Sequence, residues 1–140
     1  MLISTRGRYA MRILVDMAEH RSEKYITLKD IAERQDISEK YLESIVKVLV
    51  ANKIVTGLRG KGGGYRLARE PEQINVGDIL NYMEGGLAPV SCLDSDREPC
   101  SRASDCRTLE FWKGLDEVIR RYTSSYTVAD FVSQKHTENS

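Results

Sequence analysis

The segment from residue 27 to residue 68 constrains the fold most strongly, because two helical patterns and a glycine-rich hairpin follow one another there. A short helix is expected over residues 28–35, after Thr27, and a longer one, capped by Ser38, that reaches about residue 52. The longer helix carries an apolar stripe at helical spacing, formed by Leu42, Ile45, Val46 and Leu49. Residues 54–58 and 65–68 are expected to form strands on either side of a glycine-rich turn. Helix, tight turn, helix and two-stranded ribbon are the order of a winged helix-turn-helix fold.

The residues where the two helices cross suit a tight turn. Ile31 and the small Ala32 let the first helix approach the second closely, and Ile37 fills the turn between them. Asp36 stands where glycine is often found, and aspartate can still adopt the left-handed conformation. The local sequence therefore agrees with the order of the elements.

Helical spacing is also found outside this segment. We expect a helix over residues 5–20 with Ser4 or Thr5 as its cap, a short helix over 76–84, a strong helix over 108–122 and a last short one starting at Thr127. Residues 87–105 show no periodicity, which indicates a functional or a disordered loop. The predicted fold is mainly α with a small β-hairpin. Its parts are a winged helix-turn-helix domain over residues 1–84, a cysteine-bearing loop over 85–107, a long C-terminal dimerisation helix and a short helix over 108–132, and a polar tail over 133–140.

The net charge of zero over 140 residues hides an uneven distribution. Residues 1–69 hold 14 Lys and Arg against 8 Asp and Glu, a net charge of +6, and residues 70–140 carry −6. This division suggests that the first half binds a polyanion, although a chance partition of solvated charges gives the same numbers.

No apolar run is long enough for a membrane span, and the first eight residues are too polar for a signal peptide, so we expect a cytoplasmic protein.

The predicted second helix has a polar stripe opposite its apolar one. The N-terminal part of such a helix enters the major groove of DNA. Lysines suit phosphates, Glu43 can accept from a cytosine amino group, and Ser44 can pair with several bases. A solvated helix face would show the same polar stripe. The residues expected to face DNA from this helix are Ser38, Lys40, Tyr41, Glu43, Ser44 and Lys47.

The predicted hairpin tip favours DNA over a merely solvated face. Arg59, Gly60 and Lys61 place two cations on a backbone that can approach phosphates closely, and an arginine of this kind suits a narrow minor groove. The glycines also serve a hairpin that needs positive φ angles. No helix follows the glycine run, so it is not a nucleotide-binding loop.

Three cysteines lie within 15 residues of one another, in the pattern Cys92-x7-Cys100-x5-Cys106. An odd number of cysteines in a cytosolic chain argues against a disulfide framework. From the spacing alone, an iron–sulfur cluster, a zinc site and packed cysteines all remain open. The acidic residues around them do not lower a thiol pKa, so activated nucleophiles are not expected.

The sequence has no nucleotide-binding loop, no Cys-x-x-Cys motif and no His/Asp/Cys set, so the chain is not expected to be an enzyme.

The helix predicted over residues 108–122 is apolar on more than one face. A monomer of this size can bury one stripe, and the second would leave a large exposed patch. A two-fold partner covers it most simply, while a deeper core with the N-terminal helix is the alternative, and we expect both contacts. The residues assigned to dimerisation are Phe111, Trp112, Leu115, Val118, Ile119 and Tyr122.

Four stretches together resemble the IscR/NsrR/RirA/CymR family of bacterial regulators: residues 4–10, residues 31–35, residues 41–43 and residues 59–65. They read STRGRYA, IAERQ, YLE and RGKGGGY, and the likeness runs over about residues 1 to 132. The resemblance implies a homodimeric repressor on a pseudo-palindromic operator, with Ser38, Lys40, Glu43 and Ser44 at bases or phosphates. Arg59 takes the place of the family's minor-groove arginine. We also assign Ser4, Thr5 and Arg8 to the DNA-binding surface. Ser44 stands where IscR proteins often have glutamine, which affects the operator sequence.

The resemblance also implies an iron–sulfur cluster on Cys92, Cys100 and Cys106, and it favours 2Fe–2S over 4Fe–4S. The place of the IscR histidine is Leu109, and the place of the NsrR aspartate is Arg8. The fourth ligand is then a carboxylate, with Glu110 and Asp105 as candidates, or water. Operator affinity is expected to respond to iron–sulfur status, redox state or nitric oxide. The alternative is a CymR-like repressor of sulfur metabolism, without a cluster and controlled by a partner protein.

Overall fold

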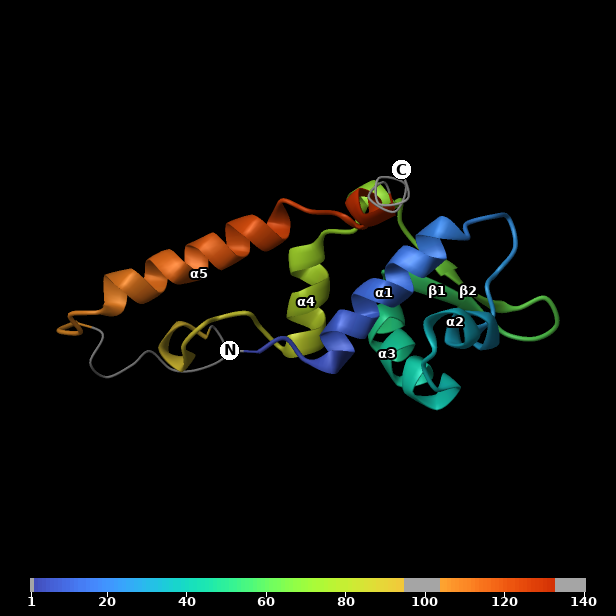
Figure 1. Ribbon diagram of the computed structural model, residues 1–140, viewed down its shortest axis with the longest axis horizontal. Coiled ribbons are helices and arrows are strands. Elements are labelled where there is room, and N and C mark those ends of the chain that lie inside the picture. The colour runs from blue at the N-terminus through green and yellow to red at the C-terminus, as the bar shows by residue number, and fades with distance from the viewer. Residues whose placement is uncertain (1, 95–103, 133–140) are drawn as a thin grey trace.

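The computed structural model describes residues 2–94 and 104–132, and it is mostly helical with one antiparallel hairpin. Figure 1 shows the hairpin at one end of the molecule and the last long helix at the other. The predicted fold class is confirmed. In chain order the elements are α1 (Thr5–Glu19), α2 (Leu28–Gln35), α3 (Glu39–Ala51), β1 (Val55–Leu58), β2 (Gly64–Leu67), the 3-10 turn Pro71–Gln73, α4 (Val76–Glu84), the 3-10 turn Ser91–Leu93 and α5 (Leu109–Ser124), followed by helical residues 128–132.

The helices of the N-terminal half start at side-chain caps. The hydroxyls of Ser4, Thr27 and Ser38 each accept a hydrogen bond from the backbone N–H three residues further on. Each cap satisfies one of the backbone donors that a helix start leaves free. Asp36 ends α2 in the left-handed region, with φ 53° and ψ 52°. The predicted helix starts and the conformation of the tight turn are therefore confirmed.

The hairpin pairs Val55 with Leu67 and Leu58 with Gly64. Ile26, which lies outside both strands, exchanges two backbone hydrogen bonds of 2.8 and 2.7 Å with Tyr65 of β2, a contact the sequence did not predict. Gly64 has a φ of +147°, and a Cβ there would lie 2.4 Å from the Ile26 carbonyl oxygen. Only glycine allows this close approach, which ties the hairpin to the segment before α2.

The core lies between α1, α2, α3 and the hairpin. Its helical members follow the predicted stripes, and α4 adds Ile79. Burial of this apolar surface is the main force that fixes the position of α3. The largest fully buried side chains of the first three helices are Ile13, Leu14, Met17, Ile31, Leu42, Ile45, Val46 and Leu49.

Helix α5 leaves this core and packs mainly on α4 (Figure 1). Ile119 lies on a second cluster formed by Val76, Leu80 and Leu87, and Met11 of α1 packs on the same cluster. Ile119 therefore makes an inward contact, but mainly with α4 and not with the N-terminal helix as expected from the sequence. Among the described residues the opposite stripe stays exposed: Phe111 is 65% exposed and Tyr122 is 64% exposed, with Leu115 and Val118 between them. None of the helices in residues 2–94 and 104–132 is long and apolar enough to cross a membrane.

Candidate nucleic-acid interface and cysteine loop

The outer face of α3 carries the predicted polar side chains at the surface. Lys40, Glu43, Ser44 and Lys47 are all exposed, opposite the buried stripe. Glu43 and Lys47 form an exposed ion pair of 3.8 Å, which contributes little to stability and leaves both groups able to change partner. The Ser44 hydroxyl donates to the Tyr41 carbonyl at 2.6 Å, so its oxygen remains an acceptor. This face can offer both charge and hydrogen bonds to a polyanion.

Tyr41 lies differently from its neighbours on α3. Its side chain is half-buried, and its ring stands edge-on to Tyr9 of α1, with 5.9 Å between centroids and 68° between planes. This is a favoured geometry for an aromatic pair. Tyr41 therefore holds the first turn of α3 against α1, a role that the sequence analysis did not assign.

The hairpin tip presents two exposed cations. Arg59, Gly60 and Lys61 are exposed, and Gly60 has a φ of +93°. Within the described part of the chain, neither Arg59 nor Lys61 has a hydrogen-bond or ion-pair partner. Both cations are therefore available for phosphate contacts without breaking an existing bond.

The three residues predicted at the N-terminus have different environments. Ser4 is half-buried, because its hydroxyl caps α1 and its backbone N–H donates to Glu84 Oε1 at 2.5 Å. Thr5 and Arg8 are exposed, and Arg8 Nη2 donates to Thr5 Oγ1 at 3.2 Å. Thr5 and Arg8 can thus meet a ligand, whereas the Ser4 side chain is already used to start α1.

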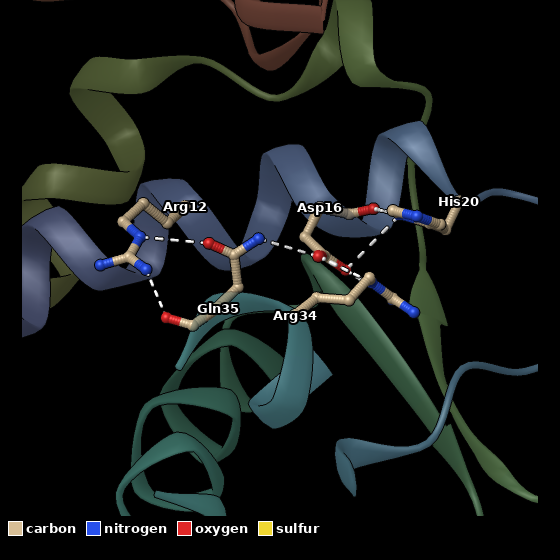
Figure 2. A network of polar contacts seen from close by, with 5 residues as sticks. All are labelled: Arg12, Asp16, His20, Arg34 and Gln35. Carbon is tan, nitrogen blue, oxygen red and sulfur yellow. Dashed lines mark hydrogen bonds and ion pairs between the residues drawn. The ribbon is translucent and has the colours of Figure 1, made fainter. Parts of the chain in front are cut away.

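A polar network around the buried Asp16 joins α1 to the end of α2 (Figure 2). Asp16 is the one buried charged side chain in the described part of the chain, and it accepts hydrogen bonds from Arg34 and Gln35. Hydrogen bonding to Asp16 raises the pKa of the Arg34 guanidinium. The sequence pattern did not reveal this network. Its one signal was a carboxylate placed between Ile13 and Met17 on a core-facing stripe, because buried acids are rare without a partner.

Two of the three predicted ligand thiols can be placed. Cys92 is half-buried in the 3-10 turn Ser91–Leu93, and Cys106 is exposed just before α5. Both are free thiols, and Cys100 lies outside the described residues. Within residues 2–94 and 104–132, no group of three or more His, Cys, Asp or Glu side chains lies together. The ligand set therefore stays a prediction.

Cys106 takes part in a short chain of hydrogen bonds at the start of α5. Its Sγ lies 3.6 Å from Thr108 Oγ1, which accepts from Trp112 Nε1 at 3.2 Å. Hydrogen bonds from the Thr108 side chain and backbone lower the pKa of the Cys106 thiol, although the charge of Asp105 raises it. Asp105 thus acts as expected of an acidic neighbour, whereas the net pKa of the Cys106 thiol is lowered. The cause is Thr108, whose position the sequence pattern did not reveal.

The two candidate carboxylates for a fourth ligand are exposed. Glu110 lies in the first turn of α5, where its Oε1 is 3.7 Å from Lys113 Nζ. Asp105 directly precedes Cys106. The exposed ion pair of Glu110 is weak enough to be exchanged for another contact.

Residues 3–134 match the Rrf2 family, which is described as an iron-dependent transcriptional regulator. The chain belongs to the Rrf2 family of transcription regulators. The resemblance predicted from the sequence is thereby confirmed. This Rrf2-family chain is a regulator and not an enzyme, again as predicted.

Named relatives are similar over nearly the whole chain. Protein rrf2 of Nitratidesulfovibrio vulgaris is 40% identical over 132 residues, which cover 94% of this chain and 87% of that protein. The regulator CymR of Bacillus subtilis is 37% identical, with coverages of 95% and 91%. The regulator IscR of Serratia proteamaculans is 33% identical, with coverages of 96% and 81%. Of the regulators named in the predicted resemblance, IscR and CymR are thus both represented.

Solved structures show the same winged-helix architecture. CymR, the global cysteine regulator of B. subtilis, superposes with a TM-score of 0.77 at 36% identity, over 96% of this chain and 98% of that one. T. potens IscR superposes with a TM-score of 0.73 at 36% identity, over 96% and 88%. The Rrf2-family fold of this chain is therefore shared with both kinds of regulator.

Proposed function

We propose that this Rrf2-family chain is a homodimeric repressor that binds a pseudo-palindromic operator in double-stranded DNA. The observation that carries the proposal is the exposed polar face of α3, next in the chain to a hairpin whose tip cations, Arg59 and Lys61, have no partner among the described residues. In this arrangement α3 enters the major groove and the hairpin tip follows the adjacent phosphates. Lys40 and Lys47 contact phosphates, and Glu43 and Ser44 read bases.

The uncovered stripe of α5 supplies the dimer contact. Phe111, Leu115, Val118 and Tyr122 lie along one side of α5 and stay exposed in the described part of the chain. A second copy buries this face by presenting the same stripe, as a two-fold interface requires. The dimer then presents two α3 helices and two hairpins to two half-sites.

In this proposal the cysteine loop senses the signal that changes operator affinity. Cys92, Cys100 and Cys106 hold an iron–sulfur cluster, and the donor set fits, since grouped thiolates are the usual cluster ligands and Cys106 has a lowered pKa. We favour 2Fe–2S over 4Fe–4S, with Glu110 or Asp105 as the fourth ligand. The cluster supplies sensitivity to iron supply, oxidation or nitric oxide when it is bound. The chain's own part is to join α4 to α5 through the loop, so that a change in the loop alters the separation of the two DNA-reading heads.

The test compares anaerobically purified holoprotein and apoprotein on one duplex, at a fixed salt concentration. The duplex is selected from a random-sequence pool by the protein itself. Iron and acid-labile sulfide are counted per dimer for the native chain and for Cys92→Ala, Cys100→Ala and Cys106→Ala. We expect cluster loss in each variant and a changed affinity in the apoprotein. Full cluster retention in all three variants would refute the ligand set, and equal affinity of both forms would refute the switch.

A second candidate function is a cluster-free, CymR-like repressor controlled by a partner protein. Two observations favour it: the 37% identity to B. subtilis CymR, and Leu109 at the place of the IscR histidine. Visible absorbance after anaerobic purification separates the two. A colourless protein without iron that still selects a DNA sequence supports this second function.

A further inference from the structure

One face of α1 contacts the helix-turn-helix through four side chains at intervals of three or four residues. Arg6 Nη2 donates to the Ser44 carbonyl at 3.4 Å, and Tyr9 stands edge-on to Tyr41. Further along α1, Arg12 and Asp16 both contact the end of α2. This face therefore contacts both α2 and α3.

Gln35 is the centre of the contact with α2 (Figure 2). Its amide nitrogen donates to Asp16 Oδ2 at 2.9 Å, and its amide oxygen accepts from Arg12 Nε at 3.1 Å. Arg12 Nη2 also donates to the backbone carbonyl of Gln35. Arg12 thus donates to both the side chain and the backbone of Gln35. Its positive charge lies where the C-terminus of α2 carries partial negative charge.

Gln35 directly precedes the turn between α2 and α3, so contacts with it affect the geometry of that turn. Gln35 is the last residue of α2, Asp36 follows in the left-handed conformation, and Ser38 already caps α3. A side chain that fixes Gln35 therefore fixes the whole turn between the two helices. The entry direction of α3 depends on the φ and ψ angles of that turn.

A second path from Arg12 leads to the first turn of α3. The Arg12 guanidinium lies over the Tyr9 ring, 4.9 Å from its centroid, and Tyr9 contacts Tyr41. Cation–π and aromatic edge contacts are directional, so they set the distance and the tilt of α3 against α1. A continuous set of contacts thus joins buried Asp16 to the helix that reads DNA.

A buried ionic group is weak evidence for stability, because apolar residues of similar volume often serve as well. The alternative reason to keep one is conformational specificity. We infer that Asp16, Arg12 and Gln35 are positioning residues for DNA recognition, which set the angle of α3 through the turn and through Tyr9. The inference rests on the proposed DNA binding by α3. It adds a set of residues that touch no base.

Arg12 is exposed, so a direct contact with a phosphate is the competing explanation for any effect of its removal. The two explanations predict different salt dependence. Loss of a phosphate contact weakens binding to every sequence and reduces the slope of log affinity against log salt by about 1. Loss of positioning weakens binding to the preferred sequence and leaves the slope unchanged.

The experiment measures affinity over a salt series for two duplexes, one selected from a random pool by the native protein and one with its sequence scrambled. The variants are Gln35→Met and Arg12→Met, and the matched control is Gln73→Met in the 3-10 turn Pro71–Gln73. We expect both variants to bind the selected duplex at least fivefold more weakly. In both variants, the affinity for the scrambled duplex and the slope of log affinity against log salt should stay at native values. The control Gln73→Met should bind both duplexes as the native protein does.

Hydrogen exchange provides a second measurement in case Gln35→Met folds poorly. Arg12→Met leaves the Asp16–Arg34 pair intact, and we expect faster exchange only at residues 36–41. An unchanged affinity for the selected duplex overturns the inference, and so does an equal loss on both duplexes with a reduced slope. If the native protein selects no sequence at all, the proposed DNA binding fails first and the inference falls with it.

Discussion

The carboxylate of Asp16 is 1% exposed, and its two oxygens accept hydrogen bonds of 2.9 and 2.7 Å from the guanidinium of Arg34. The geometry is bidentate, which joins α1 to α2 with a defined orientation as well as an attraction. His20 also approaches Asp16, with its Nδ1 2.8 Å from the backbone oxygen and 3.7 Å from Oδ1. The buried charge is therefore satisfied from several sides.

Removal of the Asp16 carboxylate is expected to destabilise the chain. Asp16→Ala leaves Arg34 and Gln35 without their acceptor. We expect the free energy of unfolding to fall by about 2 kcal/mol, below the usual range for a fully buried pair because the Arg34 side chain is 33% exposed. Urea unfolding measures the change. Glu33→Ala, at an exposed position of α2, is the control and should change it by less than about 0.5 kcal/mol. Equal effects of the two variants would contradict a structural role for the pair.

The hairpin tip is expected to contribute charge to DNA binding. Arg59→Ala and Lys61→Ala each remove an exposed cation without a partner among the described residues. Each should reduce the slope of log affinity against log salt by about 1, and Arg59→Ala should cost on the order of 1–3 kcal/mol on the selected duplex. Lys113→Ala is the control, since α5 lies at the other end of the molecule (Figure 1). If Arg59→Ala keeps the native slope of log affinity against log salt, the hairpin tip does not contact DNA.

Gly64 is expected to tolerate no side chain. Gly64 and Gly62 both have positive φ angles, 147° and 77°, but only at Gly64 would a Cβ meet backbone, 2.4 Å from the Ile26 oxygen. Alanine at Gly62 should cost about 1–2 kcal/mol, the ordinary penalty for left-handed backbone. Alanine at Gly64 should cost clearly more, because the Ile26–Tyr65 bridge must open. Thermal unfolding of the two variants compares them, and equal melting temperatures would show that the close approach does not matter.

Much of the fold could be predicted because it is encoded locally. The stripe of Leu42 and Ile45 fixes which face of α3 is buried, and the hydroxyl of Ser38 fixes where the helix starts. Asp36 could be assigned to a left-handed turn because few residue types adopt that conformation. Periodicity, caps and turn residues act over a few positions. They can therefore be recognised without knowing the tertiary structure.

The contacts that the sequence did not reveal join residues far apart in the chain. Asp16 and Arg34 are 18 positions apart, and Ile26 meets Tyr65 across 39 positions. Several arginines could have paired with Asp16, and only the packing of α2 against α1 selects one of them. Cys106 shows the same limit at short range. Its acidic neighbours are visible in the sequence, whereas the direction of the Thr108 hydroxyl is set by the start of α5.

The uncovered face of α5 is expected to hold the dimer together. Val118→Glu places a charge in the middle of the exposed apolar stripe, and a buried unpaired charge opposes association. We expect the dimer to dissociate at micromolar protein concentration. Sedimentation equilibrium measures the change. Glu117→Ala alters the neighbouring position, which forms an exposed ion pair with Arg121, and should leave the dimer intact. A Val118→Glu protein that remains dimeric would place the interface elsewhere.

The Thr108 hydroxyl is expected to control the reactivity of Cys106 in the apoprotein. The test background is Cys92→Ser with Cys100→Ser, so that only Cys106 reacts with iodoacetamide. The hydrogen bond from Thr108 lowers the thiol pKa. Thr108→Val removes that bond, raises the pKa and so reduces the thiolate fraction at any pH near it. Because the thiolate is the reacting form, the pH at which alkylation reaches half its maximal rate moves upward. Thr108→Ser keeps a hydroxyl and should behave like the parent. The same midpoint in Val and Ser variants would mean that the hydroxyl does not set the thiol pKa.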